Sequence, residues 1–179
     1  VTSSTYQLAS HFDTEWKESY APYFARHMTR RLSAVEVCDA VSQATGVFDA
    51  LPAGGTGKKV KYVMQTYSHE DLNGKELDSL KQLLQFFNQP NRDTLESDRS
   101  GSMVQASALL NSKFVKDRVR VQEKSRMHKM LNQDPPLSNE QIVEELFLAF
   151  LSRFPQPDER KVGVQTLQES HSAGLEDLA

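Results

Sequence analysis

Residues 92–102 contain the side chains that most readily suggest chemistry. They read RDTLESDRSGS and place two carboxylates, Glu96 and Asp98, two positions apart. A pair of carboxylates is the minimum equipment for glycoside hydrolysis, in which one acts as the acid and the other as the base or nucleophile. A polysaccharide-acting hydrolase that uses Glu96 and Asp98 is therefore one hypothesis for this chain.

Arginines flank the same two acids and favour a structural interpretation. Arg92 and Arg99 can pair with the carboxylates, and Ser100 or Ser102 can cap the helix that follows. No aromatic subsite accompanies the acids, so we favour an anchor over a catalytic pair. The candidate structural or binding cluster consists of Arg92, Glu96, Asp98, Arg99, Ser100 and Asn111, and no residue is assigned a catalytic role.

Other motifs that could bind a metal or cofactor are incomplete. The glycine-rich stretch GGTGKK would need glycine in place of Pro52 and Ser or Thr in place of Lys59 to form a P-loop, so a surface loop is favoured. The five histidines lack a metal-binding spacing. Cys38 has no base near it in sequence, which favours a small buried side chain over a nucleophile. No metal or cofactor is predicted.

The charge balance argues against nucleic acid as a partner. The 179 residues have a formal net charge of -3, which provides no field to attract a polyanion. The basic run KFVKDRVRVQEKSRMHK is interleaved with Asp117 and Glu123, a pattern typical of a solvated helix face. No uninterrupted apolar run reaches about 18 residues, so no transmembrane segment is predicted.

The elements that position these residues are predicted to be helices. Ser33 and Glu36 form a capping box ahead of an apolar stripe, and Gly46 supplies a stop for that helix. A second helix has an apolar stripe and ends before Pro90; the stripe comprises Leu77, Leu80, Leu84 and Phe87.

Three further helices are predicted downstream. One begins at Ser102 with Gln105 as its capping partner and extends as far as Leu131, with Met103, Ala106, Leu110 and Phe114 facing inward. Another begins at Ser138 with Gln141, and its broad apolar face predicts the most buried helix; that face comprises Ile142, Val143, Leu146, Phe147, Phe150 and Phe154. A fifth covers about 157–170, although Gly163 weakens the prediction.

Two segments depart from this pattern. The N-terminal segment is aromatic-rich and partly helical, with an interruption at Pro22. Residues 51–71 predict a long irregular loop with room for one short extended segment, KVKYVMQTY, that has no obvious partner. We therefore expect an all-α fold over residues 1–179, a single helical domain of about five to seven helices.

Four segments together resemble a known family. These are VTSSTYQLAS, RRLSAVEVCDAVSQATG, RSGSMVQASALLNSKFV and LSNEQIVEELFLAFLSRFPQPDER. In this order they resemble the planctomycete surface domain, a C-terminal domain of unknown function in large secreted bacterial proteins. Many relatives contain a CxCxR pattern where this chain has Leu95 and Ser97, so a thiol-based role does not carry over. The retained Arg99, Ser100 and Asn111 fit a structural turn and helix.

The resemblance implies a fragment of a longer multidomain protein that lacks its last helix. It also implies an extracytoplasmic location, in the periplasm, at the cell surface or secreted, and often a cytochrome-c-like haem module upstream. We expect a non-catalytic interaction or scaffold module whose partners are other domains of the same polypeptide or an envelope polysaccharide. A further hypothesis is a docking surface for the haem-carrying module in electron transfer, using the basic residues from Lys116 to Lys129.

Overall fold

The computed structural model describes residues 4–11, 14–54, 57–66, 72–87 and 103–179. The chain divides into two units, residues 1–32 and residues 33–179, and each is described by itself. The first unit contains the 3₁₀ helices η1 (Ser4–Gln7) and η2 (Glu18–Tyr23), and Pro22 lies inside η2. Its aromatic residues contact one another: the Arg26 guanidinium lies 3.9 Å from the centre of the Trp16 ring, and Tyr20 meets that ring edge-on. This unit is partly helical, as predicted, but the predicted interruption at Pro22 is wrong, because η2 continues through Pro22 to Tyr23.

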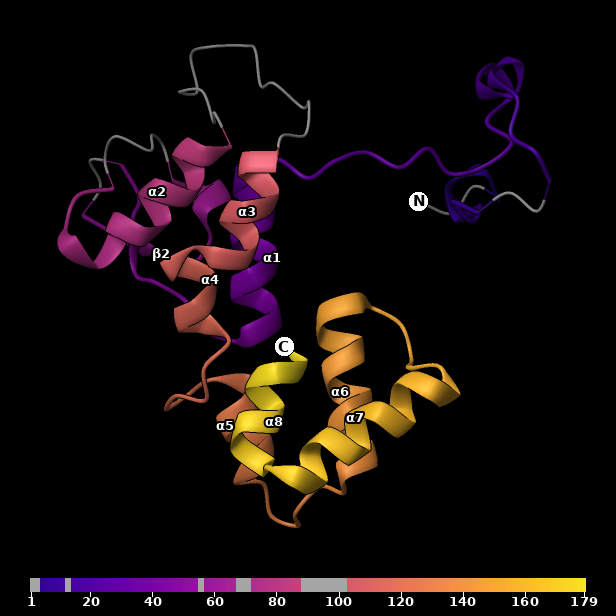
Figure 1. The fold of residues 1–179 in the computed structure, drawn as a ribbon. Helices are drawn as coiled ribbons and strands as arrows, with labels where there is room; N and C mark the ends of the chain where they lie inside the picture. Colours follow the sequence, from indigo (N-terminus) through magenta and orange to yellow (C-terminus); the bar gives the residue numbers. More distant parts are fainter. Residues whose placement is uncertain (1–3, 12–13, 55–56, 67–71, 88–102) are drawn as a thin grey trace. The chain divides into compact units, whose positions relative to one another are not determined.

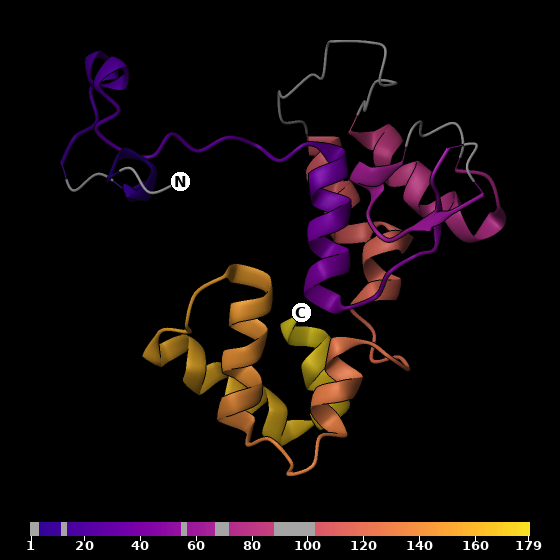
Figure 2. The same cartoon turned by 180° about the vertical axis from the view of Figure 1, so that it is seen from behind.

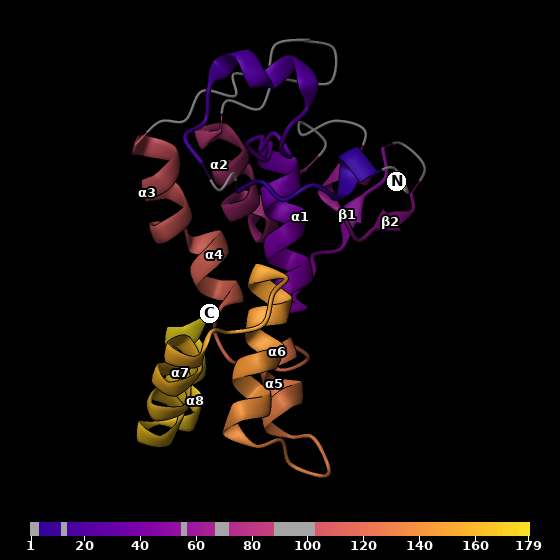
Figure 3. The same ribbon diagram turned by 90° about the vertical axis from the view of Figure 1, so that its right-hand side faces the viewer.

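The second unit begins with a cluster of helices around α1 (Ala34–Thr45), as Figure 1 shows. The cluster contains α2 (Asp78–Phe86), α3 (Met103–Asn111) and α4 (Lys113–Arg118). Figure 3 shows α3, α2 and α1 next to one another. Short elements between α1 and α2 complete it: β1 (Leu51–Pro52), β2 (Lys59–Val60), η3 (Val63–Gln65) and η5 (Lys75–Leu77).

The predicted start and stop of α1 are confirmed. The Ser33 hydroxyl accepts the Glu36 N–H, and the Glu36 carboxylate accepts the Ser33 N–H in return. Gly46 ends the helix with a φ of 73°, a left-handed conformation that costs glycine little. Asp39 on α1 then accepts the N–H groups of Val63 and Met64, which fastens η3 to the helix.

The first hydrophobic core joins these elements. Its fully or nearly fully buried members include Cys38, Leu51, Leu72, Leu80, Leu83 and Phe114. The predicted stripe on α2 is confirmed, since Leu77, Leu80 and Leu84 are buried and Phe87 packs against the same core. Burial of several leucines, at about 1.5–3 kcal/mol each, is the main force that holds α2 against α1.

A second hydrophobic core lies among the last four helices. They are α5 (Arg126–Leu131), α6 (Asn139–Leu151), α7 (Pro157–Glu169) and α8 (His171–Leu178). Figures 1 and 2 both show α8 beside α5, and the core buries Met127 of α5 with Leu175 of α8. Arg126 connects the two cores, because its Nε donates to the Ala44 carbonyl at the end of α1 at 2.7 Å.

Gly163 has a structural reason for its place within α7. A Cβ at this position would lie 2.9 Å from Cγ2 of the fully buried Val143, so glycine permits α7 to approach α6 closely. The predicted fifth helix is confirmed despite this glycine. Its first turn is fastened by Glu159, which pairs with both terminal nitrogens of Arg153 at 2.7 Å.

The helix predicted to begin at Ser102 is present as α3, but its predicted extension as far as Leu131 is wrong, because α3 ends at Asn111. The Ser112 hydroxyl accepts the Val115 N–H and starts α4 as a new helix, and a turn separates α4 from α5. Because the helix breaks at Ser112, Phe114 does not share a helix face with the three residues predicted to align with it. Phe114 is buried as predicted, whereas Met103, Ala106 and Leu110 are exposed; among the side chains of α3 that the structure describes, Ala108 is the buried one.

Two other expectations need correction. Among the described residues α1 contains five buried positions and α6 contains three, so α6 is not the most buried helix. Phe154 lies beyond the end of α6 and is exposed. The extended segment predicted at KVKYVMQTY is limited to β2, which pairs antiparallel with β1. The all-α fold class is confirmed, with eight α-helices in the described part of the chain.

Candidate functional site

The sequence-predicted cluster falls almost entirely outside the described residues. Arg92, Glu96, Asp98, Arg99 and Ser100 belong to the undescribed stretch 88–102, so their predicted pairing stays a prediction. Asn111 is described: it is exposed at the end of α3, and its Oδ1 accepts a 3.4 Å hydrogen bond from the Lys116 ammonium. The described polar centre of the unit lies elsewhere, at Arg118.

Arg118 is a buried cation on the inner face of α4. It is 5% exposed, and its guanidinium lies 3.5 Å above the centre of the Phe114 ring. One terminal nitrogen donates to the Phe114 carbonyl at 3.2 Å, and the other forms an ion pair with Asp49 in the loop after α1. Burial lowers the pKa of Arg118, and the Asp49 carboxylate opposes that change. The pair therefore fixes the position and orientation of Asp49.

Cys38 lies in the first core near this ion pair and has the properties of a structural residue. It is fully buried, and burial, together with the nearby charge of Asp39, raises the pKa of its thiol to about 12. A thiol that stays protonated at neutral pH is a poor nucleophile. The prediction of a small buried side chain is confirmed.

A pocket of about 350 Å³ with a mixed polar and apolar lining opens beside Asp49. The loop after α1, the β1–β2 hairpin and the turn leading into η5 form its walls, and its polar side chains are Asp49, Lys58, Lys59, Asn73 and Glu76. The pocket's size is typical of small-molecule sites, which span about 300–1,000 Å³. Because three separate loops contribute to it, the helical scaffold brings together residues that are far apart in sequence.

The polar side chains of the pocket differ in whether another residue fixes their position. Asp49 is anchored by Arg118, and its side chain is 30% exposed, so part of the carboxylate can reach a ligand. Within the described part of the chain, the side chains of Lys59, Asn73 and Glu76 have no hydrogen-bonding or ionic partner. Carboxylates accept, an ammonium donates and an amide does both, so the set matches a ligand that is rich in hydroxyl groups.

The glycine-rich stretch GGTGKK contributes to this pocket without forming a phosphate cradle. Gly54 and Gly57 have φ values of 44° and 68°, and both line the pocket with Lys58 and Lys59. The lining contains two lysines and two carboxylates, Asp49 and Glu76, so its side-chain charges offset each other and provide no excess positive charge for an anionic phosphate. The failure of the P-loop spacing in the sequence agrees with this geometry.

Sequence reasoning missed both Arg118 and Asp49. Arg118 was grouped with the solvated basic run, although it follows the buried Phe114 by four residues and so occupies the same helix face. That spacing was a usable signal for a buried arginine. Its partner had no such signal, because Asp49 is 69 positions away in the sequence.

No three His, Cys, Asp or Glu side chains of the described residues lie close enough to hold a metal ion. None of the described helices has both the length and the apolar character needed to cross a membrane. Comparison with curated proteins and with solved structures finds no match. A family match covers residues 1–167, and its description is "PSD1: Protein of unknown function (DUF1553)". The chain therefore belongs to the PSD1 family, whose function is unknown.

Proposed function

We propose that this chain is a non-catalytic interaction module that binds a neutral, hydroxyl-rich ligand, such as an envelope polysaccharide, in the pocket beside Asp49. The observation that carries the proposal is the anchored Asp49 carboxylate facing a pocket with Lys59, Asn73 and Glu76 around it. A carboxylate held by a buried arginine loses little conformational freedom when it binds a ligand, so less of the binding energy is spent on ordering it.

The ionisable groups of the pocket favour binding over catalysis. A general acid or base needs a pKa near the working pH, and active sites reach such values by burial or by a nearby like charge. Asp49 is neutralised by Arg118, and Glu76 is exposed at the pocket rim. The strongly shifted thiol of Cys38 lies in the closed core, where no substrate reaches it. These features support a binding role.

The proposal includes an extracytoplasmic location within a multidomain protein, with other domains of the same polypeptide as further partners. This part rests on the resemblance to the planctomycete surface domain. The hydrolase hypothesis depends on Glu96 and Asp98, which lie outside the described residues, and no described residue adds to it. The haem-docking hypothesis loses part of its basic run, because Arg118 points into the core rather than toward a partner.

Titration of the full chain with a panel of soluble neutral and acidic oligosaccharides tests the proposal. We expect a neutral oligosaccharide to bind, with about tenfold weaker binding for Asn73→Ala/Glu76→Gln, since losing the Asn73 hydrogen bonds and the charge of the Glu76 acceptor costs about 1–3 kcal/mol. The control variant Gln168→Ala/Glu145→Gln makes the same kinds of change at exposed sites on other helices and should bind like wild type. The absence of binding to every glycan, or release of new reducing ends, would contradict the proposal.

A further inference from the structure

A second concave surface lies between α2 and α3, separate from the Asp49 pocket. It has a volume of about 500 Å³ and is mainly apolar. Its apolar lining comes from Phe86 of α2 and from Met103 and Ala108 of α3, and its polar lining includes Gln82, Ser107 and Asn111. Lys113 lies at one end and is the only charged residue among the residues described as lining it.

Several apolar side chains at or near this surface are exposed to solvent. Of the residues that line the groove, Met103 is 89% exposed and Phe86 is 44% exposed; Leu110, which lies on α3 outside the groove lining, is 76% exposed. Met103, Ala106 and Leu110 follow one another at helical spacing and form a single stripe on α3. A contiguous exposed apolar stripe beside a groove is a feature of interaction surfaces, whereas isolated exposed apolar residues are not.

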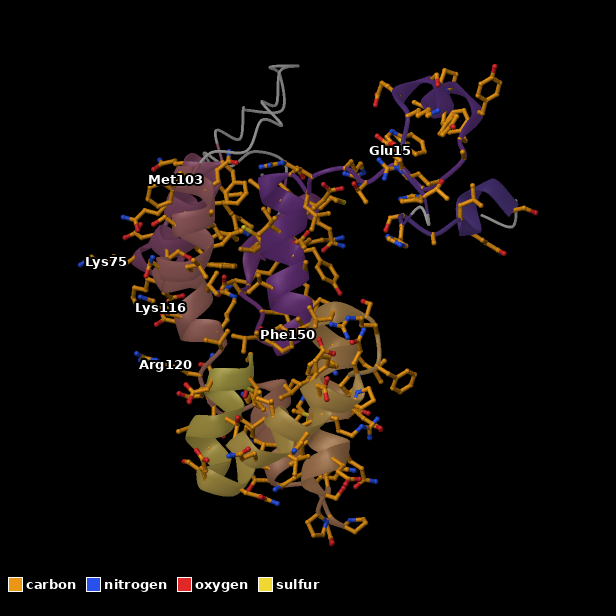
Figure 4. The ribbon with its side chains drawn as sticks, turned by 45° about the vertical axis from the view of Figure 1, so that its right-hand side comes forward. Glu15, Lys75, Met103, Lys116, Arg120 and Phe150 are labelled. Carbon is orange, nitrogen blue, oxygen red and sulfur yellow. The ribbon has the colours of Figure 1, made fainter. Side chains whose placement is uncertain are left out.

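One lysine lines this groove and a second lies one turn further along the same helix: Lys113 and Lys116 of α4. Figure 4 shows Lys75, Met103, Lys116 and Arg120 projecting toward the same side of the unit. Lys75 and Arg120 have no ionic partner in the part of the chain that the structure describes. Lys113 pairs with Asp117 at 2.5 Å, but both side chains are exposed, so this pair is weak and can exchange for another acid. A chain with a net charge of -3 thus presents a locally positive surface beside an apolar groove.

From this arrangement we propose that the α2–α3 groove docks an amphipathic helix of a partner protein or domain, with apolar side chains in the groove and acidic side chains against Lys113 and Lys116. A groove between two helices accepts a third helix through apolar anchors at helical spacing. The cations at the rim select an acidic polar face, since charge complementarity at a rim governs partner choice and association rate. This surface is independent of the Asp49 pocket.

Two synthetic amphipathic helical peptides with the same leucine face test the proposal with the full chain. One has glutamates and the other lysines on its polar face, and binding is measured by fluorescence anisotropy at low and high salt. We expect the glutamate peptide to bind at least tenfold more tightly than the lysine peptide at low salt, and this preference to shrink as salt screens the charges.

Variants locate the binding surface. Lys113→Glu/Lys116→Glu should weaken the glutamate peptide about tenfold, because each reversed rim charge contributes a modest amount. Lys129→Glu/Lys161→Glu changes the net charge equally at exposed lysines on α5 and α7 and should leave affinity within about twofold. Ser107→Trp fills the groove without altering charge and should abolish binding; circular dichroism verifies that each variant is folded.

Several outcomes would overturn the proposal. Equal affinity for the two peptides, an equal loss in the control variant, or unchanged binding by Ser107→Trp would each exclude this groove as an acidic-helix site. Self-association that Ser107→Trp abolishes would identify a second copy of the chain as the occupant. Binding that appears only after residues 88–102 are replaced by a Gly-Ser linker would mean that the chain's own segment occupies the groove.

Discussion

The Arg118–Asp49 ion pair allows a quantitative prediction because its two partners differ in burial. Arg118 is almost completely enclosed, whereas Asp49 lines a pocket that is open to solvent. Asp49→Ala leaves a buried guanidinium with the Phe114 carbonyl as its remaining hydrogen-bond acceptor in the described structure. An uncompensated buried charge of this kind destabilises a protein by about 3–5 kcal/mol.

Arg118→Met should be less destabilising. Methionine retains much of the apolar contact with the Phe114 ring, and the carboxylate left behind can be hydrated through the pocket. We expect a loss of about 1–2 kcal/mol. The double variant Asp49→Ala/Arg118→Met should be more stable than Asp49→Ala alone, because removing the arginine removes the unpaired charge.

Urea denaturation of the four proteins, followed by circular dichroism, measures these differences. In thermal unfolding Asp49→Ala should lower Tm by about 6–20 °C, at roughly 2–4 °C per kcal/mol for a chain of this size. Lys113→Ala removes the exposed Lys113–Asp117 pair and should change stability by less than about 1 kcal/mol. If Arg118→Met is as destabilising as Asp49→Ala, or if the two effects simply add, the buried-charge explanation is wrong.

Three further predictions concern other parts of the second unit. Hydrogen bonds from Arg153 and from the Gln156 N–H lower the pKa of Glu159 from 4.5 to about 2. The wild-type protein should therefore be more stable than Glu159→Gln by the full amount above pH 4.5, and this difference should disappear as the pH falls toward 2. Urea midpoints of both proteins, measured across this pH range, test the direction of the change. Gly163→Ala should destabilise by about 1–3 kcal/mol through its contact with Val143, and an unchanged Tm would refute the close approach. The Cys38 thiol, with its pKa raised to about 12, should react with a disulfide reagent at pH 8 only as fast as the protein unfolds; rapid labelling of the native protein would show that the thiol is accessible.

The sequence predicted helices best where local signals were complete. The boxes at Ser33 and Ser138 combine a hydroxyl with a Glu or Gln three residues later, and both start helices in the structure. Ser112 lacks such a partner, since Val115 occupies the corresponding position, and it lies within an apolar pattern that otherwise continues. Local sequence therefore gave no reason to break the helix there, and Met103, Ala106 and Leu110 were wrongly predicted to face inward with Phe114.

The pocket could not be predicted because it depends on long-range pairing. Asp49, Lys59, Asn73 and Glu76 belong to three loops that lack any shared motif. The packing of α2 and α4 against α1 brings these residues together. The apolar stripes in the sequence predicted part of that packing. Loops on a rigid scaffold carry sites in many proteins, and their residues are found from the fold rather than from spacing.

Arg118 links this scaffold to the proposed binding pocket. Its guanidinium is held by the Phe114 ring and carbonyl within the first core, and it in turn holds the carboxylate that lines the pocket. Packing changes around Phe114 would therefore reach a ligand through Asp49, although Phe114 itself does not line the pocket. The second core has no corresponding connection among the described residues: Arg126 joins it to the end of α1 through backbone carbonyls that lie outside the pocket lining. Changes within α6, α7 and α8 should accordingly alter the stability of the fold more than the affinity of the site.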